Sequence, residues 1–495
     1  MEKNMTIERN IVVAKIGGEL QVTPEGFRVA IGYMSNNPDI HFLVTSAFGG
    51  NPKVTNLLIA CSPEPGKSHP FYEDYHKVYE TYNSPKEVFD EIYRRHISIG
   101  DNLGYYEFPR LLNQVASIID SASKTDSESE KERFRHHIIS RGEWLSGHMW
   151  AELLGWRFVD PTELIRFRRD DRFDKRSYGS IKSRLKGEDR FVIPGFYGLG
   201  ADGTIRLFPR NGSDLTAAYI ACGISASEYQ NLKGVDGVLS ANPNIVGKRN
   251  AILIPKLTYW ENEELAYGGF QVLHQDATAP VAIAGIPLRV LNPTRSQSNP
   301  NYKGTLIVAD REIARGESVI GIAGMNGFAI LKISKEGMEY DRGIERRILH
   351  IFERNKVSIS HTPTEHTSVS IIYDERQLPE DRMDKIREEI AREIRPTETT
   401  LYRNIGILSA VGLGLMENGS EASAKLSAAL NSASIRRYGI IYMFGDISVR
   451  VFIEDSSRLD EAIKIAHKTL IEDYNTPNYL RRFFNFLLEK TGLNK

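Results

Sequence analysis

The sequence predicts an α/β protein with a mainly parallel sheet, followed by two small α+β domains. One observation is that an apolar run leading into small residues and glycines occurs twice near the start, as NIVVAKIGGEL and as IHFLVTSAFGG. A second is the segment GFRVAIGYM between them, which suits a crossover helix. Strand, helix and strand in this order begin an α/β sheet. A third is an approximate repeat of a β-α-β-β-α pattern after residue 318.

Length and composition restrict the class of protein. A chain of 495 residues, of which 41% are hydrophobic, is long enough for about two to four domains. The net charge of −1 argues against a nucleic-acid binder, which is usually basic. No apolar run approaches the roughly 18 residues of a membrane span, and the first residues lack a signal-peptide core, so we expect a cytoplasmic protein. The cysteines, Cys61 and Cys222, provide neither a disulfide framework nor zinc-type spacing, so no metal centre is expected.

The middle of the chain predicts helices followed by strands. Residues 71–132 are polar with amphipathic helical spacing, for example at Val78 and Val88. HIISRGEWLSGHMWAELLGW is interpreted as a glycine-containing turn that runs into a helix, and RFVIPGFYGLGADGTIRLF as two strands joined by an Ala-Asp-Gly turn. The charge-dense segment 165–190 predicts a solvated surface, because its mixed signs give little net field.

The segment LFPRNGSDLTAAYIACGI places polar residues directly before an apolar helix. Ser213 or Asp214 can cap this helix, and Gly212 relieves steric limits in the turn before it. Capping leaves Arg210 unexplained. A helix N-terminus with an arginine beside it also suits a carboxylate or a phosphate. The residues alone therefore allow both a cap and an anion site.

The repeat near the C-terminus runs from about 318 to 395 and from about 400 to 474. Its two halves predict small sandwich domains related by duplication. Neither half contains an acid, a base and a nucleophile together, so ligand binding or subunit packing is expected. The apolar strands FAILKI and ISVRVFI would leave sheet edges exposed, which predicts a dimer held through these domains.

Several stretches, in a shared order, resemble the aspartate kinases, members of the amino-acid kinase family with tandem ACT domains at the C-terminus. The similarity extends over nearly the whole chain. The stretches are VAKIGGEL, TSAFGGNPKVTNLL, RGEWLSGHMWAELL, PGFYGLGADGTIRLFPRNGSDLTAAYIA, GVDGVLSANPNIV, EELAYGGFQVLH, GTLIV and VSISHTPTEHTSVSIIYD.

The resemblance implies a fold and an activity. It implies an amino-acid kinase-type three-layer sandwich over 8–315, ferredoxin-like ACT domains over 316–398 and 399–476, and an extension over 477–495. The implied reaction moves the γ-phosphoryl group of ATP, with Mg²⁺, to the β-carboxylate of L-aspartate. This is the first step towards lysine, threonine and methionine.

The resemblance also implies residues for the amino-acid substrate. Arg210 matches the residue that binds the α-carboxylate, and Glu143 matches the residue that binds the ammonium group. Ser46, Thr55 and Ser213 match hydroxyls that line the same site.

On the nucleotide side, Lys15 matches the lysine that meets the phosphates, and Asp214 matches the acid that orders this lysine or the metal-phosphate cluster. Gly17 and Gly18 would let backbone N–H groups approach phosphate closely. Other positions match the surroundings of the ribose and phosphates but carry different residues from the family. They are Lys233, Gly234, Asn242 and Asn244.

The departures from the family gather on the nucleotide side. Glu19 and Leu20 stand where the family has Thr-Ser, Lys233-Gly234 where it has Thr-Asp, and Asn242-Pro243-Asn244 where it has Asp-Pro-Arg. A carboxylate at residue 19 repels a triphosphate unless a cation intervenes. Three functions stay open: an active aspartate kinase, a weak or inactive amino-acid-binding regulatory subunit, and a kinase for another small amino acid.

The resemblance further implies an amino-acid effector, often lysine or threonine, at the ACT domains. In the first repeat, GMNGFAILKIS and GMEYDRGIERR offer a glycine-bounded loop and a helix start at Gly343. The helix start suits a ligand carboxylate, and Asp341 could face its ammonium group. Ordinary capping and packing explain the same residues equally well.

Overall fold

A computed structural model describes residues 10–473 apart from 187–188, 210, 270–274, 314–317 and 442–445. The chain divides into two compact units. The first comprises Met1–Val238, Leu253–Tyr259 and Val272–Arg311, and the second comprises Leu239–Ile252, Trp260–Gln271 and Glu312–Lys495.

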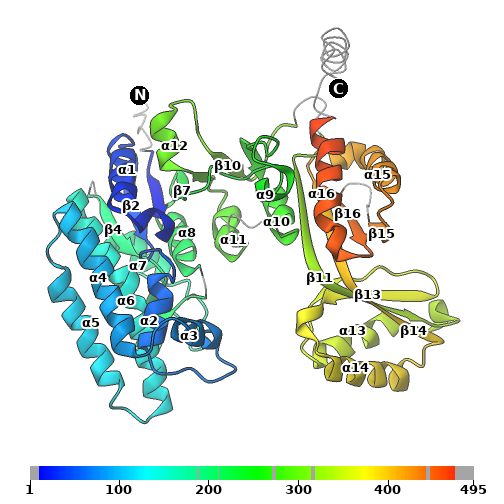
Figure 1. Ribbon diagram of the computed structural model, residues 1–495, viewed down its shortest axis with the longest axis horizontal. Coiled ribbons are helices and arrows are strands. Elements are labelled where there is room, and N and C mark those ends of the chain that lie inside the picture. Colours follow the sequence, from blue (N-terminus) through cyan, green and yellow to red (C-terminus); the bar gives the residue numbers. More distant parts are fainter. Residues whose placement is uncertain are drawn as a thin grey trace, which may run out of the picture. The chain divides into compact units, whose positions relative to one another are not determined.

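The first unit is built on an eight-stranded sheet with the order β3-β4-β2-β1-β7-β9-β10-β8 (Figure 1). All neighbouring strands run parallel except β9 and β10. The predicted α/β class with a mainly parallel sheet is therefore confirmed. The strands are β1 (Val12–Ile16), β2 (Ile40–Thr45), β3 (Arg157–Phe158), β4 (Phe191–Pro194), β7 (Glu228–Leu232), β8 (Lys256–Thr258), β9 (Leu288–Leu291) and β10 (Thr305–Val308).

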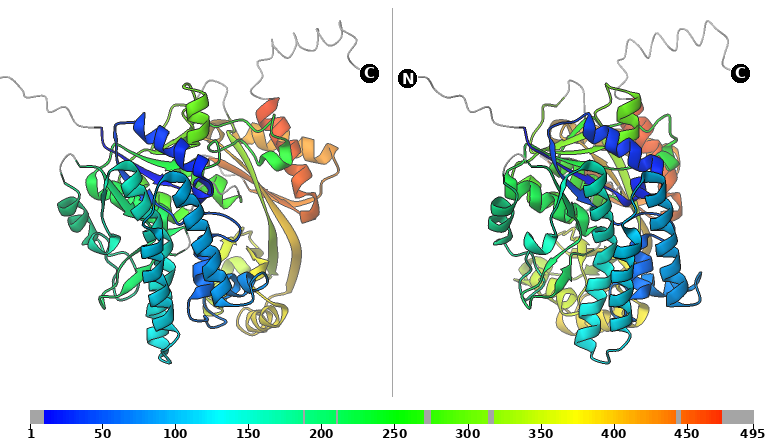
Figure 2. Two further views of the ribbon diagram at one scale, coloured as in Figure 1. Left: turned by 60° about the vertical axis from the view of Figure 1, so that its left-hand side comes forward. Right: turned by 90° about the vertical axis from the view of Figure 1, so that its left-hand side faces the viewer.

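Helices cover both faces of this sheet, which is why its central strands are apolar throughout. Val12, Ala14 and Ile16 of β1 share one core with the helices on one face, where α4, α5 and α6 run alongside one another (Figure 2). Lys15 projects to the other face, where α8 packs against β1 and β7. The helices of the first face are α1 (Pro24–Ser35), α2 (Val54–Cys61), α4 (Pro85–Leu103), α5 (Phe108–Ala122) and α6 (Glu128–Leu154), and those of the second are α7 (Ser177–Arg184), α8 (Gly212–Ile224) and α11 (Gln275–Ile283). The unit also contains α3 (Tyr72–Tyr79) and α12 (Pro293–Ser298).

Helix α6 corrects one prediction, because its 27 residues continue without a break through the expected turn at Gly142. A Cβ atom added at Gly142 would lie 2.8 Å from Ala47 Cβ and 3.0 Å from Leu58 Cδ1. The glycine therefore serves close packing against the segment after β2, not a turn. This packing brings the next residue, Glu143, beside that segment.

A hairpin of β5 (Tyr197–Leu199) and β6 (Ile205–Leu207) follows β4. Gly203, with φ of +77°, lies in its turn, where the Ala-Asp-Gly sequence predicts a tight connection. Three strands thus stand where the sequence predicts two, because β4 ends at Pro194 and a new strand begins at Tyr197.

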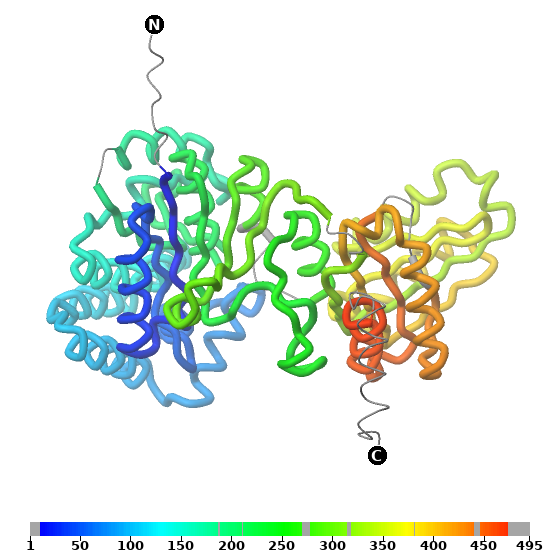
Figure 3. The backbone as a smooth tube through the Cα atoms, turned by 90° about the horizontal axis from the view of Figure 1, so that it is seen from above, coloured from blue at the N-terminus to red at the C-terminus, as the bar shows by residue number. Residues whose placement is uncertain are grey.

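The second unit contains a six-stranded antiparallel sheet with the order β12-β13-β11-β14-β16-β15. Two long strands, β11 and β14, run through its centre, and the two halves of each strand pack against the helices of different repeats. Helices α13 and α14 lie along one end of these strands and α15 and α16 along the other (Figure 1, Figure 3). The elements are β11 (Gly321–Ser334), α13 (Ile344–Arg354), β12 (Ile359–His361), β13 (Ser368–Asp374), α14 (Glu380–Glu393), β14 (Glu398–Val411), α15 (Leu415–Ser432), β15 (Arg437–Ile441), β16 (Ser448–Ile453) and α16 (Leu459–His467).

The shared strands overturn the predicted sheet edges. FAILKI lies in β11 and ISVRVFI in β16, and both strands have a neighbour on each side. The second repeat takes one of its strands from the first half of β11, so the two small sheets join within one chain. Exposed edges at these two strands therefore give no argument for a dimer.

The predicted effector residue Asp341 already has cationic partners. Its carboxylate pairs with Lys335 at 2.6 Å and with Arg347 at 2.6 Å. Helix α13 begins after Gly343, whose φ of +75° ends the preceding loop.

Two segments that the sequence assigns to 8–315 pack in the second unit. The first segment contains the short helix α9 (Pro243–Val246). Ala241, just before this helix, and Val246, at its end, share a core with α15 and α16. Ser240 Oγ lies 2.8 Å from Nε2 of the buried His467. The second segment, Trp260–Gln271, contains all of helix α10 (Tyr259–Tyr267) except its first residue. In the described parts of the chain, every helix is too short or too polar to span a membrane.

Candidate active site

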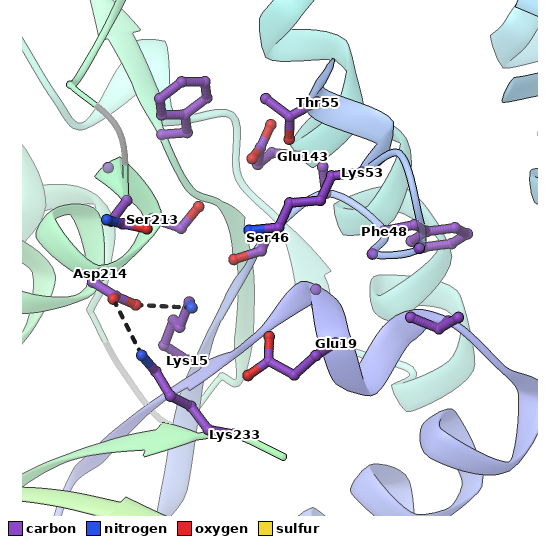
Figure 4. Close-up of a pocket in the computed structure, with 18 of the residues that line it drawn as sticks. Lys15, Glu19, Ser46, Phe48, Lys53, Thr55, Glu143, Ser213, Asp214 and Lys233 are labelled. Atoms are coloured by element: carbon purple, nitrogen blue, oxygen red, sulfur yellow. Dashed lines mark ion pairs between the residues drawn. The ribbon is translucent and has the colours of Figure 1, made fainter. Parts of the chain in front are cut away.

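The carboxyl ends of β4, β2, β1 and β7 meet at one edge of the first sheet, because these neighbours are parallel. Ligands of open α/β sheets bind at such an edge. A pocket of about 380 Å³ lies there (Figure 4). It is lined by Lys15, Gly18, Glu19, Val22, Ser46, Ala47, Phe48, Gly49, Gly50, Lys53, Thr55, Phe71, Glu143, Phe196, Asn211, Gly212, Ser213, Asp214 and Lys233.

An ion pair joins β1 to the start of α8. Lys15 and Asn231 are register partners on β1 and β7, and both reach Asp214. Lys15 Nζ lies 2.8 Å from Asp214 Oδ1, and Asn231 Nδ2 donates to the same oxygen at 3.1 Å. Lys233 Nζ lies 3.9 Å from Asp214 Oδ2. Lys15 and Asp214 are buried, with 6% and 4% of their surfaces exposed.

The two partners keep each other charged. Burial by itself lowers the pKa of Lys15, but the charges of Asp214 and Glu19 outweigh it and raise the pKa above its usual value. Burial by itself raises the pKa of Asp214, but Lys15 and Lys233 hold it below its usual range. The pocket therefore contains a fixed ammonium group at neutral pH.

The start of α8 differs from the predicted cap. Asn211, with φ of +64°, occupies the N-cap position, and its side chain makes no capping hydrogen bond. Ser213 and Asp214 lie in the first turn instead, so neither is the N-cap that the sequence allowed. Asp214 is drawn away by Lys15, which offers a full charge where the helix offers only N–H groups. Arg210, the predicted carboxylate-binding residue, lies outside the described residues.

Glu143 is the second buried carboxylate of the pocket, with 4% of its surface exposed. Burial raises its pKa to about 8, although a hydrogen bond from the backbone of Ala47 and the charges of Lys15 and Arg141 oppose the shift. Within the described residues, Glu143 Oε2 has no hydrogen-bond partner. A buried carboxylate with an open oxygen suits a cationic ligand.

The predicted residues divide between two ends of the pocket (Figure 4). Glu143 and Thr55 lie at one end, here named the Glu143 end, and Lys15, Lys233 and Glu19 at the other, named the Lys15 end. Ser46 lies between the two ends, and Ser213 lines the pocket from the first turn of α8.

The remaining predicted residues lie in two places. Gly17 and Gly18 form the turn after β1, and Gly234 N–H donates to Glu19 Oε1 at 3.4 Å. Asn242 and Asn244 belong to the second unit, where Asn242 Oδ1 accepts from Asn244 N–H at 3.0 Å and caps α9. Lys15 belongs to the first unit, and the nucleotide role of this pair stays a prediction.

Gln21 is a supporting residue that sequence reasoning missed. Its side chain is fully buried, and its amide donates to Ser46 O at 3.0 Å and to Gly17 O at 3.3 Å. Its carbonyl accepts from Ser146 Oγ at 2.7 Å and from Trp150 Nε1 at 2.8 Å. One side chain thus joins the turn after β1, the segment after β2 and α6. A polar residue just after the glycine turn was the available signal.

Phe196 and Lys53 also line the pocket without having been predicted. Phe196 has a left-handed backbone with φ of +78°, which is costly for a bulky residue. Its N–H donates to Thr216 Oγ1 at 3.0 Å, which helps to hold this conformation. Strained backbone of this kind gathers at functional sites.

Comparison with known proteins identifies similar chains. The model of the amino acid kinase family matches residues 10–292. Aspartokinase 3 of Bacillus subtilis is 27% identical over 439 residues, which cover 86% of this chain and 90% of that protein.

Solved structures agree with these matches. The crystal structure of aspartate kinase from Clostridium acetobutylicum has a TM-score of 0.75 and 30% identity, and the match covers 93% of this chain and 100% of that one. Aspartokinase III of Escherichia coli, crystallised with aspartate and ADP, shares the fold with a TM-score of 0.71 at 20% identity, over 93% of this chain and 99% of that one.

Proposed function

The chain belongs to the amino acid kinase family, among the aspartate kinases, and we propose that it transfers the γ-phosphoryl group of ATP to the β-carboxylate of L-aspartate. One observation carries the assignment of this reaction to the pocket. A fixed Lys15–Asp214 ion pair and the buried carboxylate of Glu143, whose Oε2 has no hydrogen-bond partner among the described residues, share one cavity at the carboxyl edge of a parallel sheet.

The Glu143 end is proposed to bind the α-amino acid group. An ammonium group would supply the hydrogen bond that Glu143 Oε2 does not receive from the described residues, and it would lower the pKa of this carboxyl group. Thr55, Ser46 and Ser213 would donate to the substrate's carboxylates, and Arg210 would bind its α-carboxylate as a planar fork.

The Lys15 end is proposed to bind the phosphates. The substrate's β-carboxylate is ionised at neutral pH, so it attacks the γ-phosphorus without a general base. The new P–O bond forms as the bond between the γ-phosphorus and the bridging oxygen breaks, and ADP leaves. Lys15 neutralises the charge that develops on the phosphoryl oxygens, while Asp214 holds the ammonium group in place.

The nucleotide is proposed to be ATP with Mg²⁺. The Escherichia coli neighbour of this fold was crystallised with ADP, the product that ATP would leave. Mg²⁺ binds nucleotides through phosphate oxygens and one or two carboxylates, and Asp214 is the buried carboxylate at this end. Bound there, the ion supplies positive charge to the phosphates.

Two finer proposals concern the second unit. We expect a homodimer and an amino-acid effector because the resembling proteins have both. A hollow of about 740 Å³ beside Gly343, lined partly by Asp341 and Thr364, offers space for such an effector. Sedimentation at micromolar concentration and thermal shifts with lysine or threonine test these two proposals.

The reaction is tested by trapping the acyl phosphate as a hydroxamate. Purified protein with ATP, Mg²⁺ and L-aspartate should give the hydroxamate, and Arg210→Ala should raise the KM for aspartate strongly. A signal with another small amino acid in place of aspartate would change the substrate. A signal equal to that of the enzyme-free control with every amino acid tried would leave a regulatory, amino-acid-binding role.

A further inference from the structure

The carboxylate of Glu19 folds back over the glycine turn at the end of β1. A Cβ atom added at Gly17 would lie 2.4 Å from Glu19 Oε2 and 2.6 Å from Oε1. Oε1 also accepts the hydrogen bond from Gly234 N–H, at the end of β7. Figure 4 shows the side chain directed towards Lys15 and Lys233. The Glu19 carboxylate thus lies at the ends of β1 and β7 and is directed towards two ammonium groups.

These surroundings are typical of a phosphate-binding site. A glycine turn after a parallel strand lets phosphate oxygens approach the backbone closely, and lysines supply the opposite charge. Burial lowers the pKa of Lys233 overall, but the charge of Glu19 acts in the opposite direction there, as it does at Lys15. In the described structure, a carboxylate of the chain itself stands where phosphate oxygens would be attracted.

We propose that Glu19 is an internal anion that competes with the nucleotide phosphates for the glycine turn and the two lysines, and so weakens nucleotide binding. The proposal rests on the proposed function, because it assigns the phosphates to the Lys15 end. It gives the departure at residue 19 a physical role: the nucleotide binds after this carboxylate swings away.

Glu19 is suited to leave, whereas Asp214 is not. Glu19 is an exposed residue, and the hydrogen bond from Gly234 is long at 3.4 Å. Asp214 is buried and receives hydrogen bonds from Lys15 and Asn231. Of the two carboxylates at this end, Glu19 is therefore the one that can rotate into solvent at small cost.

The test compares the wild type with Glu19→Gln, which keeps an oxygen for Gly234 and removes only the charge. Binding of ADP is measured by calorimetry in EDTA and again with Mg²⁺. The variant should bind ADP about three- to tenfold more tightly in EDTA, since one like charge is removed at short range. The gain should be smaller with Mg²⁺ and should shrink as salt is added. Affinity for aspartate should stay the same.

Glu25→Gln is the matched control, because Glu25 is an exposed glutamate of the same charge on the first turn of α1, outside the pocket. An equal change in both variants would overturn the proposal, since only net charge would then matter. Weaker ADP binding by Glu19→Gln in Mg²⁺ would overturn it too, because Glu19 would then assist the metal-bound nucleotide.

Inorganic tripolyphosphate serves as a second probe, which separates this proposal from the proposed function. Tighter tripolyphosphate binding by Glu19→Gln than by the wild type supports the internal anion even in a protein that fails to phosphorylate aspartate. Equal binding of both probes by the two proteins overturns the internal anion even when aspartate is phosphorylated.

Discussion

The two ends of the pocket contain carboxylates that are equally buried but differ in charge state. Glu143 and Asp214 each have 4% of their surface exposed. Burial raises the pKa of Glu143 to about 8, whereas the Lys15 and Lys233 charges outweigh burial and hold the pKa of Asp214 below its usual range. Burial alone therefore does not decide the charge of a carboxylate here; a cationic partner at hydrogen-bond distance does.

This difference separates binding from chemistry. At the Glu143 end, Oε2 receives no hydrogen bond from the described residues, so a ligand's ammonium group can supply one and specificity depends on the ligand. At the Lys15 end, the ammonium group is already held at 2.8 Å from Asp214. A charge fixed in advance stabilises a transition state without reorganisation.

The largest expected effect comes from breaking the Lys15–Asp214 ion pair. Lys15→Met should lower kcat by about 10³-fold, because the positioned cation is lost. It also leaves Asp214 buried without its main partner, which should lower the free energy of unfolding by about 3 kcal/mol. Urea unfolding and steady-state kinetics measure the two effects.

The double variant Lys15→Met/Asp214→Asn separates these effects. Removing the stranded charge should restore most of the stability while activity stays lost. Persistent instability in the double variant would mean that Lys15 supports the fold by packing and not by pairing. Activity close to wild type in Lys15→Met would remove Lys15 from the chemistry.

The second-largest effect is expected at the Glu143 end of the pocket. Binding an ammonium group needs the charged form of Glu143, so a proton on this group opposes binding below pH 8. With a pKa of about 8, the KM for aspartate should fall about tenfold from pH 7 to pH 9. Glu143→Gln should flatten this profile and raise the KM for aspartate about 30-fold, while the KM for ATP stays constant.

Glu152→Gln is the matched control, since Glu152 is an exposed glutamate on the same helix. Its pH profile should follow the wild type. A wild-type KM for aspartate that stays flat from pH 7 to pH 9 would contradict a raised pKa at Glu143. If Glu143→Gln changed the KM for ATP as much as the KM for aspartate, Glu143 would not be a residue that binds the amino acid specifically.

Much of the pocket was predictable because it is built from local patterns. The strand ends followed by glycines and the polar helix start are such patterns, the resemblance to aspartate kinases identifies Lys15, Ser46 and Asp214 within them, and the parallel sheet brings these residues together. Their individual roles stay predictions. The continuous α6 was not predictable, because Gly142 is required by packing against a segment that is distant in sequence.

Long-range pairing explains the other differences. The strand containing FAILKI is interior only because β14, more than sixty residues later, lies beside it. The segment that contains Asn242 and Asn244 packs with α15 and α16, which follow much later in the chain, and its nucleotide role stays a prediction. Gln21 gains its role from Ser146 and Trp150, which are 125 and 129 residues away.

The smallest expected effect tests whether Gln21 links the two ends. Leucine at this position has a similar size but cannot hydrogen bond, so Gln21→Leu leaves the Ser46 carbonyl, the Ser146 hydroxyl and the Trp150 N–H without their partner. Because Gln21 holds both the turn after β1 and the segment after β2, the KM values for aspartate and ATP should rise together, each about three- to fivefold. Glu143→Gln, in contrast, should change the KM for aspartate alone. Ser146→Ala removes one donor, and its effect should combine with Gln21→Leu less than additively if the two act through one bond. Additive effects, or a rise in only one KM, would show that Gln21 supports one end and leaves the two ends independent.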